Sequence, residues 1–340
     1  MNYQTNGRIT QGVGGLYTIR LDTTHDNPTP LDGMTITCRA RGVFRHEGTT
    51  PLPGDRVTVG YDDTSLKTDE FGHILPTEDG SGIRMEDILE RRCALIRPPM
   101  ANLEVLFISM AAAKPAPLLP TVDKLICIVE HNHIEPVIII GKADLDAERA
   151  NELKALYQKA GFDAFVVSCE RGEGIEAIAQ YVRQKAKDKI AAFAGASGVG
   201  KSTLMNALFP TLARMTGEIS QKNARGRHTT REVTLFPLSE LLPDCEGATG
   251  YIADTPGFSL LDFTRFDFFE KDDLPATMRD FAPYLGLCRY SDCTHLKEEG
   301  CAVLEAVRNG DIAPSRHESF VSIYNDLKDK HPWSKIPSHH

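Results

Sequence analysis

Long apolar runs are missing from this sequence of 340 residues. No stretch reaches about 18 consecutive apolar residues, so we expect no membrane-spanning helix and no membrane partner. The start of the chain carries neither a basic segment nor an apolar one, so we expect no secretory signal and a cytoplasmic protein. An excess of positive charge is missing as well: the net charge is -9, whereas nucleic-acid binders usually carry a basic face. Composition therefore gives no support for RNA binding.

Residues 1–92 predict a β domain with its connector. Short alternating runs at 7–21, 34–42 and 55–60 are separated by turns rich in Gly, Pro and Asp. Closing such strands into a small barrel removes their exposed edges. An OB-type barrel and another kind of small barrel both fit this pattern.

After a break at 97–99 the pattern alternates between strands and helices. Short apolar runs, some rich in β-branched residues, suit parallel strands that are buried on both faces. These runs cover 105–108, 137–140, 164–167 and 190–194. Helices are expected between them, at 146–160 and 174–187. The alternation predicts an α/β domain with a mostly parallel sheet at 93–264.

A phosphate-binding loop follows the fourth apolar run. It satisfies G-x-x-x-x-G-K-[ST], with a strand before it and a helix-like segment after it, as the motif requires. Backbone N–H groups and the helix N-terminus favour bound phosphates. Lys201 is expected to reach the β- and γ-phosphates, and Ser202 to bind Mg²⁺. The predicted nucleotide contacts are Gly195, Ala196, Ser197, Gly198, Val199, Gly200, Lys201, Ser202 and Thr203.

A D-x-x-G element, Asp254 to Gly257, lies further along the chain after a short apolar run. Asp254 can hold Mg²⁺ through water, and the Gly257 N–H can meet the γ-phosphate. The polar segment between the two elements has no periodicity and is typical of a switch loop. Thr230 in that loop is the expected ligand of Mg²⁺ and the γ-phosphate, with Thr229 as an open alternative.

Residues 141–144 resemble the N-K-x-D box that reads guanine. The Asp144 carboxylate can accept hydrogen bonds from N1–H and the 2-amino group of guanine, a donor pair that adenine does not offer. Lys142 is expected along the plane of the base. Gly141 stands where the box has asparagine, which predicts weaker affinity and could relax base selection. A second element at 168–169 suits a backbone N–H that meets the guanine O6. The predicted base contacts are Gly141, Lys142, Ala143, Asp144, Ser168 and Cys169.

Three of the eight cysteines cluster with a histidine in the pattern C-x₄-C-x-H-x₅-C. Cys288, Cys293, His295 and Cys301 offer three sulfurs and one imidazole, which suit tetrahedral zinc with no open position for catalysis. We predict one structural Zn²⁺ in a mainly helical domain with a helical tail at 265–340. The other five cysteines are expected to be reduced thiols.

The nucleotide-binding elements stand in a rotated order. The base box precedes the phosphate loop, whereas an ordinary small GTPase has it afterwards, and the D-x-x-G element follows the loop. This order implies that the chain ends of the domain have been moved while the neighbouring strands stay together.

The rotated elements, the barrel before them and the cysteine–histidine cluster after them resemble the RsgA (YjeQ) family of circularly permuted ribosome-biogenesis GTPases. Further matching segments are 95–102, 226–230 and 256–258. The resemblance covers nearly the whole chain and implies an OB-fold domain, a permuted GTPase domain and a zinc domain. It implies binding of GTP and GDP, and stimulation by the small (30S) ribosomal subunit, whose 16S rRNA it would contact late in maturation. We expect a monomer.

The same resemblance implies a catalytic role for His228, because Phe258 stands where Ras-like enzymes have a glutamine. The expected catalytic groups are thus Lys201, His228 and Thr230, with Mg²⁺ held by Ser202, Thr230 and Asp254. Two other functions remain open. One is an rRNA-binding assembly factor that senses the nucleotide and hydrolyses it weakly. The other is an ATP-using P-loop enzyme, which leaves Asp144 and Ser168 unexplained.

Overall fold

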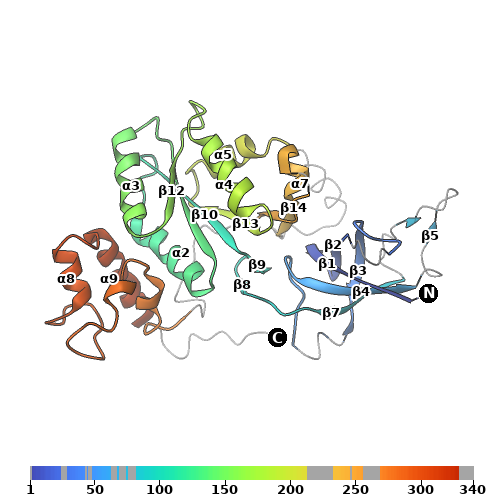
Figure 1. The fold of residues 1–340 in the computed structure, drawn as a ribbon, viewed down its shortest axis with the longest axis horizontal. Helices are drawn as coiled ribbons and strands as arrows, with labels where there is room; N and C mark the ends of the chain where they lie inside the picture. The colour runs from blue at the N-terminus through green and yellow to red at the C-terminus, as the bar shows by residue number, and fades with distance from the viewer. Residues whose placement is uncertain are drawn as a thin grey trace.

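The computed structural model shows three structural units along the chain (Figure 1). The described residues are 2–23, 29–42, 44, 48–62, 67–68, 74–75, 82–212, 233–245, 247–255 and 269–328. Within these ranges, every helix is too short or too polar to cross a bilayer.

The N-terminal unit is a closed barrel with the strand order β1-β2-β3-β7-β4. Its strands are β1 (Asn2–Val13), β2 (Leu16–Leu21), β3 (Thr35–Ala40), β4 (Arg56–Asp62) and β7 (Ile83–Ile88). Alternate side chains fill the barrel, among them the fully buried Ile9, Ile19 and Val57. The barrel predicted from the sequence is confirmed.

Two details of the N-terminal unit differ from the prediction. The run at 7–21 is a hairpin rather than one strand, because Gly14 and Gly15 adopt positive φ values of 59° and 82° and reverse the chain. Two small ribbons accompany the barrel. They pair β5 (Lys67–Thr68) with β6 (Ile74–Leu75), and β8 (Ala94–Ile96) with β9 (Pro99–Ala101).

The central unit is built on a six-stranded sheet with the order β12-β11-β10-β13-β15-β14. Its strands are β10 (Val105–Ala111), β11 (Glu135–Gly141), β12 (Asp163–Val166), β13 (Ile190–Gly195), β14 (Thr234–Pro237) and β15 (Tyr251–Asp254). Neighbouring strands are parallel except for β14 and β15, which are antiparallel. The four predicted apolar runs are therefore strands β10 to β13. The strand that precedes the phosphate loop is central in the sheet although it is fourth in the chain, as the rotated order requires.

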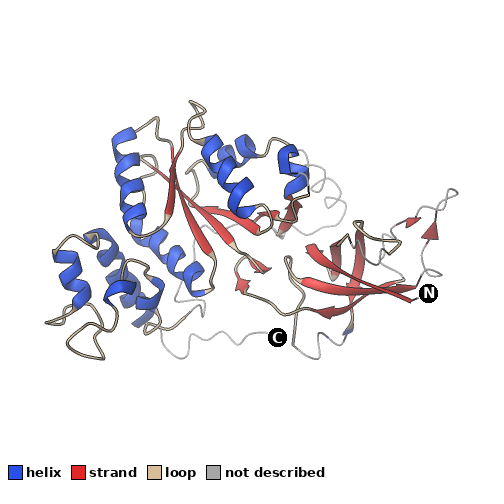
Figure 2. Cartoon of the chain, viewed as in Figure 1, coloured by secondary structure: helices blue, strands red, loops and turns tan. Residues whose placement is uncertain are grey.

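Helices cover both faces of this sheet (Figure 2). One face carries α2 (Leu119–His131) and α3 (Ala147–Lys159), and the other carries α4 (Ile175–Tyr181), α5 (Lys201–Leu208) and α7 (Leu238–Leu241). The predicted helix at 174–187 is α4 continued by a π-helical turn, η2 (Val182–Ala186). No helix was predicted at 119–131, where α2 lies.

The C-terminal unit packs on the outer face of α2. It contains η4 (Leu274–Thr277), η5 (Ala282–Tyr284), α8 (Ala302–Arg308) and α9 (Pro314–Lys328). Its core includes Cys127 and Ile128 of α2. At the junction, the fully buried Arg316 of α9 pairs with Asp123 of α2 at 2.5 Å and with Asp280 at 3.1 Å. The C-terminal unit is thus anchored to the central unit by a charged network as well as by apolar packing.

Candidate functional site

The phosphate loop has the strand–loop–helix geometry that its motif predicts. Strand β13 ends at Gly195, and α5 begins at Lys201 directly after Gly200. Gly195, Gly198 and Gly200 all have positive φ, at 155°, 80° and 98°. A Cβ on Gly195 would lie only 2.5 Å from the Ser109 carbonyl oxygen, so the chain needs glycine there. The loop therefore holds its backbone close to the sheet at a helix N-terminus, where phosphate groups bind favourably.

The Lys201 ammonium and the Asp254 carboxylate attract each other at this end of the sheet. Asp254 closes β15, the strand beside β13. Burial lowers the pKa of the Lys201 ammonium, and the Asp254 carboxylate acts in the opposite direction. Burial likewise raises the pKa of Asp254 against the effect of Lys201. Ser202 and Thr203 are exposed on the first turn of α5. A cation and a carboxylate on one side of the loop suit a phosphate chain with a bound divalent cation.

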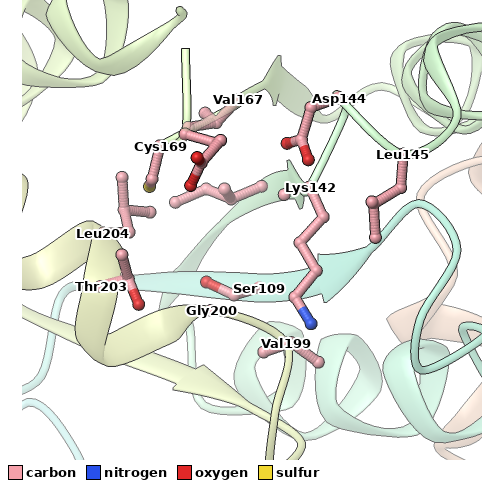
Figure 3. Close-up of a pocket in the computed structure, with 13 residues that line it drawn as sticks. Ser109, Lys142, Asp144, Leu145, Val167, Cys169, Val199, Gly200, Thr203 and Leu204 are labelled. Atoms are coloured by element: carbon pink, nitrogen blue, oxygen red, sulfur yellow. The ribbon is translucent and has the colours of Figure 1, made fainter. Parts of the chain in front are cut away.

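A cavity of about 280 Å³ opens beside the phosphate loop, between the ends of β10, β11 and β12 and the start of α5 (Figure 3). Adjacent strands whose connections diverge open such a crevice at the carboxyl edge of a sheet. The lining residues come from segments far apart in the chain. They are Ser109, Ile139, Gly141, Lys142, Asp144, Leu145, Val167, Cys169, Glu170, Val199, Gly200, Thr203 and Leu204.

Asp144 is held in place inside this cavity. The fully buried Ser168 donates its hydroxyl to Asp144 Oδ1 at 2.8 Å and accepts the Arg171 N–H at 3.2 Å. Because Ser168 supplies one hydrogen bond, the carboxylate keeps lone pairs for two further donors in one plane. Ser168 therefore orients the base-reading group, a role that the sequence pattern did not assign to its side chain.

Lys142 and Gly141 border the same cavity. Lys142 adopts a φ of 57°, and its Nζ donates to the Lys114 carbonyl oxygen at 2.5 Å. Figure 3 shows its alkyl chain stretched across the opening towards Val199. A Cβ on Gly141 would lie 3.3 Å from the Val199 carbonyl oxygen. A longer side chain at 141 would therefore contact the phosphate loop, and glycine leaves that space open.

Four predicted site residues lie outside the described residues. They are His228, Thr229, Thr230 and Gly257. The described residues bring together the phosphate loop, the base box, the element at 168–169 and Asp254. They also add Ser109, which sequence reasoning missed. Its only signal is that a polar residue follows the apolar run at 105–108.

The cysteine–histidine cluster lies beside the core of the C-terminal unit. The donor atoms of Cys288, Cys293, His295 and Cys301 all lie within 4.8 Å of one another. Cys288 Sγ and Cys301 Sγ are 3.9 Å apart, and each lies 3.5 Å from His295 Nδ1. A tetrahedron with metal–sulfur bonds of about 2.3 Å and metal–nitrogen bonds of about 2.0 Å has edges of about 3.8 and 3.5 Å. The cluster is therefore compatible with zinc.

Burial shifts the pKa values at this cluster. It raises the pKa of the Cys293 thiol to about 12 and lowers the pKa of His295. A neutral imidazole and a thiolate are the forms that bind metals, so a bound metal would have to favour the thiolate of Cys293. All eight cysteines are free thiols, as expected for the five that lie outside the cluster.

The fold and the site together define a circularly permuted P-loop GTPase. The model of the RsgA GTPase family matches residues 88–264, and that of the RsgA N-terminal domain matches residues 6–66. The chain belongs to the RsgA GTPase family.

Relatives and solved structures agree with this assignment. The small ribosomal subunit biogenesis GTPase RsgA of Caldanaerobacter subterraneus subsp. tengcongensis is 37% identical over 325 residues, which cover 95% of this chain and 96% of that protein. The crystal structure of YjeQ from Thermotoga maritima has a TM-score of 0.72 and a sequence identity of 28%. The match covers 97% of this chain and 100% of the YjeQ chain. YloQ, a circularly permuted GTPase, has a TM-score of 0.69 and 30% identity, covering 97% of both chains.

Proposed function

We propose that this chain is a monomeric, cytoplasmic GTPase that binds the small ribosomal subunit through its 16S rRNA and assists late maturation. Subunit binding stimulates hydrolysis of GTP to GDP and phosphate. One observation carries the proposal: the Ser168-held Asp144 and the phosphate loop border a single cavity, in a chain whose relatives are named for small-subunit biogenesis. An ATP-using enzyme has no need of this carboxylate.

The roles of the nucleotide contacts follow from their positions. Asp144 reads N1–H and the 2-amino group, and Cys169 supplies the backbone N–H for O6. Lys142 covers one face of the base with its alkyl chain. The amides of 195–203 surround the phosphates, and Lys201 offsets the charge that develops on the γ-phosphate. Gly141 and Ala143 bring the box close to the phosphate loop.

Hydrolysis also needs the switch residues. Ser202, Thr230 and Asp254 are proposed to hold Mg²⁺, which would offset the negative charge of the phosphates. Thr229 is the alternative to Thr230, and Gly257 is proposed to meet the γ-phosphate. Phe258 cannot orient a water molecule, so we assign that task to His228. Turnover is then slow until the subunit stimulates it.

The three proposed domains are 1–92, 93–264 and 265–340. Zn²⁺ held by Cys288, Cys293, His295 and Cys301 is proposed to be structural, since four protein ligands close its coordination shell. The observed distances between the donor atoms of Cys288, His295 and Cys301 support this ligand set.

The test is single-turnover hydrolysis of GTP with and without purified small subunits, with ATP as the control nucleotide. We expect stimulation by subunits for GTP alone. Hydrolysis that ignores the subunit would leave a nucleotide-sensing assembly factor, and equal use of ATP would leave a general P-loop enzyme. His228→Ala is expected to lower the stimulated rate without weakening GDP binding, and an unchanged rate sinks its assignment.

A further inference from the structure

Ser109 is out of place in a buried apolar strand. All seven residues of β10 are buried, and Val105 and Phe107 on the same side of the strand belong to the apolar core around α4 and α5. Ser109 is only 5% exposed, and its hydroxyl has no hydrogen-bond partner within the described ranges. A buried hydroxyl without a partner is destabilising. This cost is understandable if the group has a partner when the cavity is filled.

The Ser109 side chain borders the nucleotide cavity at its phosphate end. Figure 3 shows it on β10, between Lys142 and Thr203. The Ser109 Cβ would lie 3.2 Å from a Cβ on Gly195, and Val199 Cγ2 would lie 3.1 Å from the same position. The Ser109 side chain therefore lies beneath the phosphate loop.

The two ends of the site set the orientation of the base. Asp144 takes the N1 and 2-amino edge, and the phosphate loop takes the phosphates. In an anti nucleotide the phosphates lie on the C8 side of the purine, so the edge with N7 and C8 turns towards the loop. N7 is an acceptor only. Gly141 has no side chain to donate to it, and a hydroxyl is a rotatable donor.

Resting on the proposed function, we propose that the Ser109 hydroxyl is a nucleotide-binding group that donates to N7 of the guanine, directly or through one water molecule. Ser109 thereby supplies the contact that an asparagine at 141 would otherwise make. It adds to affinity and excludes purines that lack the N7 acceptor.

The experiment compares GDP with 7-deaza-GDP, in which carbon replaces N7, by calorimetry on the full chain. Wild type is expected to bind 7-deaza-GDP about 5- to 10-fold more weakly than GDP, the factor expected of one neutral hydrogen bond. Ser109→Ala is expected to lose the same factor for GDP and nothing for 7-deaza-GDP. Ser109→Thr, which keeps the hydroxyl, is expected to retain the preference.

The matched control is Thr5→Val in the barrel, which removes another buried hydroxyl that has no partner among the described residues. It is expected to leave both affinities unchanged. Equal affinity of wild type for the two nucleotides overturns the inference even if Ser109→Ala does not fold. An equal loss for both nucleotides in Ser109→Ala overturns it as well. If wild type binds neither GDP nor GTP, the proposed function itself fails, which is a separate outcome.

Discussion

Restoring an asparagine at position 141 is expected to tighten nucleotide binding. The φ of Gly141 is not in the left-handed region, so other residues can adopt its backbone conformation. A Cβ there would lie 3.3 Å from the Val199 carbonyl oxygen and 3.6 Å from that of Met110, so the neighbours need to shift by only a few tenths of an ångström. The side-chain amide can then donate to the Val199 carbonyl and to the base.

The magnitude follows from the hydrogen bond that the amide makes with the base, because the bond to the Val199 carbonyl forms with or without nucleotide. One neutral hydrogen bond contributes about 1 kcal/mol, which corresponds to about fivefold tighter binding of GDP and GTP. Since Ser109 makes the N7 contact in wild type, this factor is expected when Gly141→Asn is added to Ser109→Ala, and a smaller gain is expected when it is added to wild type. Gly141→Ala supplies the Cβ without the amide and is expected to show no gain.

Calorimetric titration of GDP, with ATP as a control, measures both variants. The reasoning is refuted if Gly141→Ala tightens binding as much as Gly141→Asn, or if Gly141→Asn weakens it. Because the new amide takes over the contact to N7, the loss caused by Ser109→Ala is also expected to shrink in the Gly141→Asn background. A loss that stays the same means that Ser109 and position 141 do not share a partner.

Three further changes test the base box, the metal cluster and the junction of the units. Asp144→Asn removes charge-assisted hydrogen bonds that contribute about 1.5–3 kcal/mol, so the affinity for GTP is expected to fall about 10- to 100-fold. The affinity for xanthosine triphosphate, which has a 2-oxo acceptor, is expected to rise. Competition titration with the two nucleotides shows whether the base preference changes. Purified protein is expected to release one zinc per chain to a chromogenic chelator after thiol modification. Cys293→Ser is expected to release less zinc, and Cys245→Ser is expected to release as much as wild type. If Cys293→Ser releases as much zinc as wild type, the ligand set is wrong. Arg316→Met leaves two buried carboxylates without their cation, so it is expected to lower the opening free energy of the C-terminal unit, measured by amide exchange, by about 3–5 kcal/mol. The exposed Arg149→Met is expected to lower it by less than about 1 kcal/mol. Similar losses in the two variants would show that the network is not important for stability.

Local patterns in the sequence were sufficient for much of the site. The phosphate loop could be predicted because its glycines, its lysine and the flanking strand and helix are close in the chain, and their conformations depend mainly on neighbouring residues. The cysteine–histidine cluster has similarly short spacing, so its ligands were found together in space. The rotated order of the elements needed only the linear sequence, and it already indicated a permuted GTPase.

Other features depend on which distant segments pack together. Ser109 belongs to the nucleotide cavity because β10 pairs with both β11 and β13, and no local pattern states that pairing. The buried contact of Arg316 with Asp123 depends on two helices that are far apart in the chain. Motifs of near neighbours could thus be recognised from the amino acids alone, whereas Ser109, the role of the Ser168 hydroxyl and the anchoring of the C-terminal unit required the packed structure, because burial and long-range pairing determine which polar groups meet.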